Sequence, residues 1–341
     1  RPSSIPANAN AEDKKKIEEN NERTKYAMVS VIIHEVGHNY FPMIVNSDER
    51  QWSWMDEGLN SFLQYRAEQE LPEAVWTKDL KRSPYPSRRG PVANIVGYMK
   101  SAPETQVPIM TNSEQVKQFG NNAYGKPATA LNALRETILG KQLFDFAFKQ
   151  YAQKWKFRHP EPADFFRTME DASGTDLDWF WRGWFYTNDF YEPSIEKVTL
   201  FKILAQGQSL PNNAPFPTKE INVATALDRM EKMGIKMNEN EKQMLSPSTN
   251  FYVLHIKNNG ELVMPLIVEL TYKDGTKETK YFPAEIWRMN HKEIKKLVAS
   301  SKEVVSFKLD PNAETADTET NNNTFPRTEN STQFDQMKSG K

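Results

Sequence analysis

The apolar positions between residues 26 and 33 predict a buried helix. Most side chains in this stretch are apolar, which is typical of a helix with a wide buried face. Pro42 is expected to end the helix, because proline lacks the backbone donor that a continuing helix needs. Residues 1–22 are rich in Pro, Ser, Asn, Glu and Lys, a composition that predicts a flexible, solvated leader.

A second helix is predicted shortly after the first. Polar residues and tryptophans at 46–54 turn the chain, and Ser53 with Asp56 has the spacing of a capping box. Apolar residues then recur at helical spacing, at Leu59, Phe62 and Leu63. We therefore expect residue 57 in the first turn of a helix that packs beside the first one.

Helical periodicity continues to about residue 188, with one interruption. Prolines break the pattern between 75 and 125 and leave a single helix near 92–101. From 126 to 188 apolar and aromatic residues recur at helical spacing, which is more typical of a helix core than of a set of ligands. The stripe includes Leu131, Leu134, Ile138, Leu143, Phe146, Phe148, Phe165, Phe166, Met169, Leu177, Phe180, Trp181, Trp184 and Phe185. Residues 23–192 are expected to form one mainly helical region.

After Pro193 the pattern changes to the alternation that is typical of β-strands. Asn259-Gly260 and Asp274-Gly275 have the composition of tight hairpin turns. The predicted strands are 251–257, 265–273, 276–283 and 304–309. We expect an antiparallel β-sandwich over 193–312, with a helical insertion near 219–245 whose methionines fill gaps in the core. Residues 313–341 are mostly polar and predict a disordered tail.

Composition limits the classes of function. With 341 residues, 38% of them hydrophobic, the chain can form two or three packed domains. A net charge of -1 gives no basic field for nucleic acid, and no apolar stretch reaches the length of a membrane span. Because there is no cysteine, a metal site must be built from His and carboxylates.

The sequence leaves oligomeric state and cellular location open. The chain starts at Arg1 with neither a Met nor a signal-peptide pattern, which suggests a processed chain or an excised fragment. An exported, periplasmic or cell-envelope bacterial protein is the working expectation.

The first predicted helix carries the motif His34-Glu35-Val36-Gly37-His38. Positions i and i+4 lie on one helix face, so both imidazoles can bind one metal ion with Glu35 beside it. After 18 intervening residues, Glu57 offers a third ligand. By chance, such a motif with an acid at one further fixed position occurs on the order of one time in a thousand. Three protein ligands leave the fourth position of a tetrahedral zinc open to water, so the pattern predicts a zinc hydrolase.

The motif and its neighbours resemble the aminopeptidase N and leukotriene hydrolase family of gluzincin zinc metallopeptidases. The similar segments are His34–His38, Trp54-Met-Asp-Glu57-Gly58, Tyr124-Gly-Lys-Pro-Ala128 and Ser173-Gly-Thr-Asp-Leu177 leading to Trp184. The resemblance implies an α+β multidomain fold. It consists of the mainly helical C-terminal part of a thermolysin-like zinc peptidase catalytic domain, followed by an Ig-like antiparallel β-sandwich.

The resemblance also implies roles for particular residues. His34, His38 and Glu57 are expected to bind one Zn²⁺ ion. Glu35 is expected to act as the general base while zinc-bound water attacks the carbonyl of a peptide substrate. Tyr124 aligns with the family tyrosine whose hydroxyl donates to the developing oxyanion. Zinc-dependent peptide hydrolysis of the aminopeptidase type is the function that these residues favour.

Three departures from the family pattern qualify this interpretation. Asp56 stands where many relatives have Asn, and Ser61 stands where thermolysin-like endopeptidases have Asp. The Gly-x-Met-Glu-Asn type of segment, which binds the substrate amine in family aminopeptidases, is not found in this sequence. Since only 33 residues precede His34, we expect a fragment of a longer aminopeptidase, which alone lacks the amine-recognition wall. Alternatives are another gluzincin hydrolase, such as a glycyl aminopeptidase, and a non-catalytic scaffold descended from a peptidase.

Other candidates carry less weight. His159, His255 and His291 have no spacing that predicts a second metal site. Arg88-Arg89 could receive a substrate carboxylate, but a solvated loop pair is the favoured interpretation.

Overall fold

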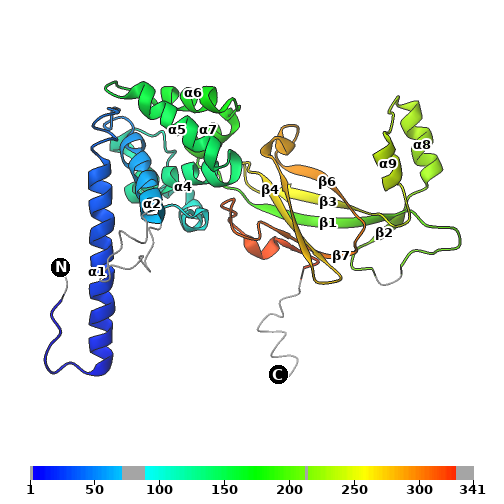
Figure 1. The fold of residues 1–341 in the computed structure, drawn as a ribbon, viewed down its shortest axis with the longest axis horizontal. Helices are drawn as coiled ribbons and strands as arrows, with labels where there is room; N and C mark the ends of the chain where they lie inside the picture. The colour runs from blue at the N-terminus through cyan, green and yellow to red at the C-terminus, as the bar shows by residue number, and fades with distance from the viewer. Residues whose placement is uncertain (1–2, 71–88, 212–213, 328–341) are drawn as a thin grey trace. The chain divides into compact units, whose positions relative to one another are not determined.

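The computed structural model of the protein describes residues 3–70, 89–211 and 214–327 (Figure 1). The chain divides into two compact units, one of residues 1–189 with 314–316 and the other of residues 190–313 with 317–341. The first unit is helical, and the second contains two β-sheets. Among the described residues, no helix combines the length and apolar character needed to cross a membrane.

Helix α1 (Ala11–Gly37) begins inside the segment that was predicted to be a flexible leader, so that prediction is wrong from Ala11 onward. The Asn10 side chain accepts a hydrogen bond from the backbone of Asp13 and caps the helix, and Lys16 pairs with Glu12 one turn earlier. A cap and i,i+4 ion pairs can stabilise a helix whose residues are mostly polar, and average hydrophobicity does not detect such a helix.

The predicted burial of residues 26–33 is only partly correct. Tyr26 and His34 are the buried side chains of α1, while Met28, Val31 and Ile32 are each more than half exposed. The helix therefore packs through one narrow face, against α2 (Leu59–Glu70), which lies beside it in Figure 1.

A π-helical turn, Trp54–Gly58, leads into α2. The predicted capping box is wrong, because the Ser53 hydroxyl donates to the Ser113 hydroxyl at 2.6 Å and makes no cap. In α2 the Asn60 side chain donates to the His34 carbonyl at 2.8 Å. A Cβ at Gly37 would collide with the Asn60 side chain, so the glycine allows the two helices to approach closely.

The rest of the helical unit supplies the core beneath these two helices. Trp54 contacts Phe185 and Phe166 contacts Trp181, with ring centroids 4.8 and 4.7 Å apart. The aromatic stripe is therefore mostly helix core, as predicted. Phe146 is exposed, Ile138 and Leu143 are only half-buried, and Phe144 is buried. The elements are a 3-10 turn (Val92–Ile95), α3 (Val96–Met99), a π-helical turn (Gly120–Gly125), α4 (Lys126–Ala133), a π-helical turn (Leu134–Ile138), α5 (Lys141–Trp155), α6 (Pro162–Ser173) and α7 (Asp178–Phe185).

Two four-stranded sheets form the second unit, in the orders β2-β1-β3-β6 and β5-β4-β7-β8. Among the strands in the described part of the chain, β2 alone runs parallel to its neighbour, β1. Tyr252 of β3 and Phe307 of β7 pack with ring centroids 5.4 Å apart, which places the two sheets face to face. The predicted fold class, helices followed by a β-sandwich, is confirmed. The bounds are β1 (Pro193–Lys202), β2 (Thr218–Glu220), α8 (Val223–Lys232), α9 (Glu239–Met244), β3 (Asn250–Asn258), β4 (Leu266–Tyr272), β5 (Lys277–Phe282), β6 (Glu293–Ser300), β7 (Val304–Leu309) and β8 (Thr324–Phe325).

One of the two predicted hairpins is correct. Asp274-Gly275 joins the antiparallel pair β4 and β5, and Gly275 has the positive φ that such a turn requires. Asn259-Gly260 does not form a hairpin, because β3 and β4 belong to different sheets. The predicted core role of the methionines in the insertion is also wrong at Met233, which is 73% exposed.

The predicted disordered tail is ordered in its first part. Asp317 forms a β-bridge with Tyr191, and the Thr318 backbone donates to the Tyr191 carbonyl at 3.0 Å. Strand β8 then pairs with β7. Backbone pairing therefore orders a segment of low hydrophobicity. Residues 328–341 of the predicted tail lie outside the described residues.

Asp317 makes the stability of the β unit depend on pH. Burial, with the charges of Asp310 and Glu192, raises its pKa from 3.8 to about 7. The folded state therefore holds a proton that the unfolded state releases, so stability falls as the pH rises from about 4 to about 7. We expect Asp317→Asn to remove this loss of stability. Compared with the wild type, the variant should gain up to about 4 kcal/mol in free energy of unfolding at pH 8 relative to pH 4.

Thermal unfolding of both proteins across this pH range measures the effect. Asp228→Asn, at an exposed position of α8, is the control and should leave the pH dependence of the unfolding midpoint as in the wild type. A wild-type midpoint that rises between pH 4 and pH 7 relative to the variant would contradict the prediction.

Candidate metal centre

The end of α1 and the turn before α2 bring three metal-ligating side chains together. His34 lies in the last turn of α1, and His38 is the C-cap residue one turn later. Their Nε2 atoms are 3.1 Å apart. Glu57 Oε2 lies 3.0 Å from the His34 Nε2 and 3.4 Å from the His38 Nε2. The three predicted ligands thus meet at one point.

These separations suit a tetrahedral zinc ion. Ligand atoms at the usual zinc distance of about 2.0 to 2.1 Å, at tetrahedral angles, are about 3.3 Å apart. The observed separations of 3.0, 3.1 and 3.4 Å are close to that value. Two imidazoles and one carboxylate are also a donor set that zinc prefers, and three ligands leave a fourth position open. The residues present therefore fit the metal.

The outward nitrogens of both imidazoles are fixed by hydrogen bonds. His34 Nδ1 lies 3.0 Å from Gln64 Oε1, and His38 Nδ1 lies 2.9 Å from the Phe41 carbonyl. Because both partners are oxygen acceptors, each Nδ1 carries the proton and each Nε2 keeps its lone pair for a metal. The local structure thus selects the tautomer that can ligate.

Gln64 is itself oriented by a short chain of hydrogen bonds. Its amide nitrogen donates to Glu68 Oε1 at 3.0 Å, which turns the amide oxygen toward His34. The Ser30 hydroxyl donates to the same Glu68 oxygen. We did not predict Gln64 and Glu68 from the sequence, although their positions 7 and 11 residues after Glu57 place them on one face of α2.

The Glu57 carboxylate is shared between the metal position and Tyr124, whose hydroxyl donates to Oε1 at 2.5 Å. Burial opposes ionisation of Glu57, but its contacts with His34 and Tyr124 and the proximity of His38 lower its pKa overall. Burial and the hydrogen bond to Glu57 raise the pKa of Tyr124 well above its usual range. The phenol therefore stays neutral and remains a hydrogen-bond donor at physiological pH.

Asp56 lies directly behind His38. Its Oδ1 is 2.8 Å from His38 Nδ1, yet that nitrogen donates to Phe41, so Oδ1 receives no hydrogen bond. Burial, a hydrogen bond with Glu49 and the nearby carboxylate of Glu57 raise the pKa of Asp56 to about 8. A bound dication would oppose this shift.

Glu35 and Arg89 complete the wall of the site. A pocket of about 310 Å³ is lined by Ser30, Val31, His34, Glu35, His38, Glu57, Gln64, Arg89 and Tyr124. Glu35 is exposed to it, and the guanidinium carbon of Arg89 lies 4.3 Å from the centre of the Tyr124 ring. The prediction of a solvated loop pair is therefore wrong for Arg89, whose pKa is lowered by burial. Arg88 lies outside the described residues.

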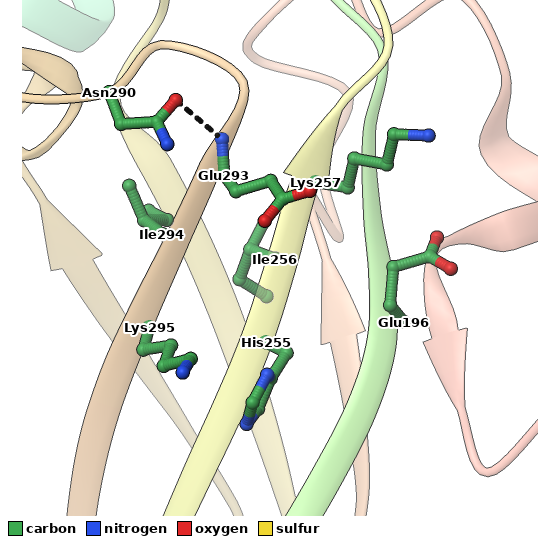
Figure 2. Close-up of a pocket in the computed structure, with 8 residues that line it drawn as sticks. All are labelled: Glu196, His255, Ile256, Lys257, Asn290, Glu293, Ile294 and Lys295. Carbon is green, nitrogen blue, oxygen red and sulfur yellow. Dashed lines mark hydrogen bonds between the residues drawn. The ribbon is translucent and has the colours of Figure 1, made fainter.

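The remaining histidines lie apart from this centre. His159 Nδ1 is 3.0 Å from the Asn46 carbonyl, and His291 pairs with Glu261 at 2.8 Å. Figure 2 shows His255 on the open face of β3, among residues that line a shallow pocket of about 440 Å³. Strand register places Lys197 and Lys295 on either side of His255. Burial and these two lysines lower the pKa of His255, so the surroundings disfavour a metal cation.

A group of acids in the helical unit also brings ligand atoms within 4.8 Å of one another. It consists of Glu170, Asp176 and Asp178. Asp176 and Asp178 are exposed, and Glu170 already accepts a hydrogen bond from the Leu177 backbone at 2.8 Å. Exposed acids of this kind are typical of a solvated surface, and we assign no metal to them.

Known proteins have sequences similar to this chain. Residues 12–184 match the model of the peptidase family M1 domain. Human glutamyl aminopeptidase is 23% identical over 249 residues, which are 66% of this chain and 24% of the relative. Alanine/arginine aminopeptidase of Saccharomyces cerevisiae is 27% identical over 157 residues, 44% of this chain and 17% of the relative. The chain thus spans about a quarter or less of the length of these curated relatives.

Among solved structures, aminopeptidase A of Legionella pneumophila in complex with aspartic acid is similar to this chain. The two have a TM-score of 0.45 and 14% sequence identity, and the match covers 84% of this chain and 26% of that chain.

Proposed function

Because this chain belongs to peptidase family M1, we propose that it carries the zinc centre of a metallopeptidase that releases amino-terminal residues from peptides. One observation carries the proposal. Three donor atoms from α1 and the turn before α2 converge at tetrahedral separations, while both outward imidazole nitrogens are held by oxygen acceptors. Such an arrangement prepares the side chains for a metal ion before it binds.

His34, His38 and Glu57 would hold one Zn²⁺ ion. When bound in such a site, zinc supplies a Lewis acid and lets water lose a proton near neutral pH. Glu35 follows His34 directly in α1 and is exposed in the same pocket. Its carboxylate can accept a proton from a water molecule there and return it to the departing amine.

Tyr124 would supply the oxyanion donor. In the structure its hydroxyl donates to Glu57, so binding of a substrate carbonyl requires it to exchange that partner for the new oxygen. The ring is covered on one face by Arg89, whose positive charge lies beside the position where negative charge would develop. Both residues therefore favour a transition state with a negatively charged oxygen.

The aminopeptidase assignment is supported by the names of the relatives, and substrates that differ only at the amino terminus test it. We expect the complete protein, as its gene encodes it, to contain about one zinc ion per chain and to hydrolyse aminoacyl anilides. A chelator should abolish hydrolysis and added zinc should restore it. The matched N-acetylated compounds should not react.

Three outcomes are distinguishable. Equal hydrolysis of free and acetylated compounds would refute the aminopeptidase assignment and favour another hydrolase. Zinc without hydrolysis of any peptide would favour a different electrophile. Absence of both zinc and hydrolysis would refute the proposed function and favour a scaffold.

A further inference from the structure

Lys126 is a buried cation for which the proposed chemistry has no use. It is the first residue of α4 and is only 1% exposed. Its Nζ donates to the Thr187 carbonyl at 3.1 Å. Burial lowers the pKa of Lys126 to about 8, and the carboxylate of Asp189 opposes that shift. Burying an ammonium group is costly, so a side chain that merely filled this space would be better replaced by an apolar one.

The position of Lys126 connects it to Tyr124. The π-helical turn Gly120–Gly125 carries Tyr124, and Lys126 follows that turn directly. The bond from Lys126 ties the end of the turn to residue 187, two residues after α7 ends. Within the turn, two residues before Tyr124, the Asn122 side chain donates to the Val107 carbonyl at 2.7 Å. The backbone around Tyr124 is thus held on both sides.

The same turn rests on the turn that contains Glu57. A Cβ added to Gly58 would lie 2.6 Å from Pro127 Cγ and 3.0 Å from the Ala123 carbonyl oxygen. These two residues flank Tyr124 in the sequence, so the glycine allows the two turns to approach closely. The position of the Tyr124 hydroxyl relative to Glu57 therefore depends on how the backbone of the turn Gly120–Gly125 is held.

We propose that Lys126 is a positioning residue, whose buried ammonium group fixes the turn that carries Tyr124 and so aims the tyrosine hydroxyl at the reacting carbonyl. The inference rests on the proposed function. A tyrosine ring has only two side-chain torsions, so its hydroxyl moves with the backbone that carries it. A displacement of about 1 Å at such a donor can reduce turnover by roughly a hundredfold.

A double-mutant cycle in the complete, zinc-loaded protein tests whether Lys126 acts through Tyr124. Lys126→Met keeps the length of the side chain and removes the ammonium group. We expect it to lower kcat by roughly tenfold to a hundredfold while KM changes less than about twofold. In a Tyr124→Phe background the same substitution should lower kcat by less than about twofold, because no hydroxyl remains to be positioned.

Two further variants keep the test decisive. Asp189→Asn removes the charge that favours the ammonium form and should cause a smaller loss of kcat, again only when Tyr124 is present. It carries the test alone if Lys126→Met does not fold. Lys149→Met, at an exposed position of α5, is the control and should leave kcat and zinc content unchanged.

The outcomes separate this inference from the proposed function. Losses that multiply in the Tyr124→Phe background would show that Lys126 only supports the fold, and would overturn the inference. A Lys126→Met protein with wild-type kcat would do the same. If the wild-type protein binds no zinc and cleaves no peptide, it is the proposed function that fails.

Discussion

Replacing Glu57 with alanine is expected to empty the zinc centre of the complete protein and to abolish hydrolysis. The substitution removes one of the three proposed ligands, and it also removes the carboxylate that the Tyr124 hydroxyl and the His34 Nε2 now contact. Loss of a residue that only supports a ligand commonly lowers metal affinity by about 10-fold to 100-fold, so loss of the ligand itself should exceed about 100-fold. Zinc per chain, measured after equilibration in a zinc buffer, shows the change directly.

Glu114→Ala is the matched control for this experiment. Glu114 is an exposed acid of the same unit, paired with Arg50 at the surface, and its loss should leave the zinc content at the wild-type level. An isolated pair of imidazoles at i and i+4 binds zinc weakly, which makes the expected contrast large. Equal zinc content in the Glu57→Ala and wild-type proteins would show that the third ligand is elsewhere.

The sequence could predict that His34, His38 and Glu57 come together because they are close along the chain. His34 and His38 are related by helical spacing alone, and Glu57 lies at the start of the next helix. Gln64 could have been found by extending the helical spacing from Glu57 along α2. The contact between Arg89 and Tyr124 could not be predicted, because it joins positions 35 residues apart and no periodicity connects them.

The errors in the predicted fold have a common physical origin. The leader and the tail were judged by average composition, which does not include specific interactions such as the Asn10 cap in one and the bridge between Tyr191 and Asp317 in the other. Composition also predicted a turn at Asn259-Gly260 without showing which strands it joins. A turn signal fixes the direction of the chain locally, whereas strand pairing depends on contacts far along the sequence.

Glu35→Gln is expected to separate metal binding from catalysis. The amide has the shape of the carboxyl group but cannot take a proton from water, so the zinc-loaded variant should lose about 100-fold to 10,000-fold in kcat. Glu35 is exposed, and the three proposed ligands do not include it, so the zinc content should match that of the wild type.

Steady-state kinetics of the complete protein with an aminoacyl anilide, together with zinc analysis of the same samples, measure both effects of Glu35→Gln. Glu18→Gln changes another exposed acid of α1 and should alter neither. A Glu35→Gln protein with wild-type kcat would show that a different group takes the proton. A variant that loses zinc would instead place Glu35 among the groups that hold the metal. A variant with wild-type zinc content and a strongly reduced kcat is the result expected if Glu35 accepts the proton beside the metal.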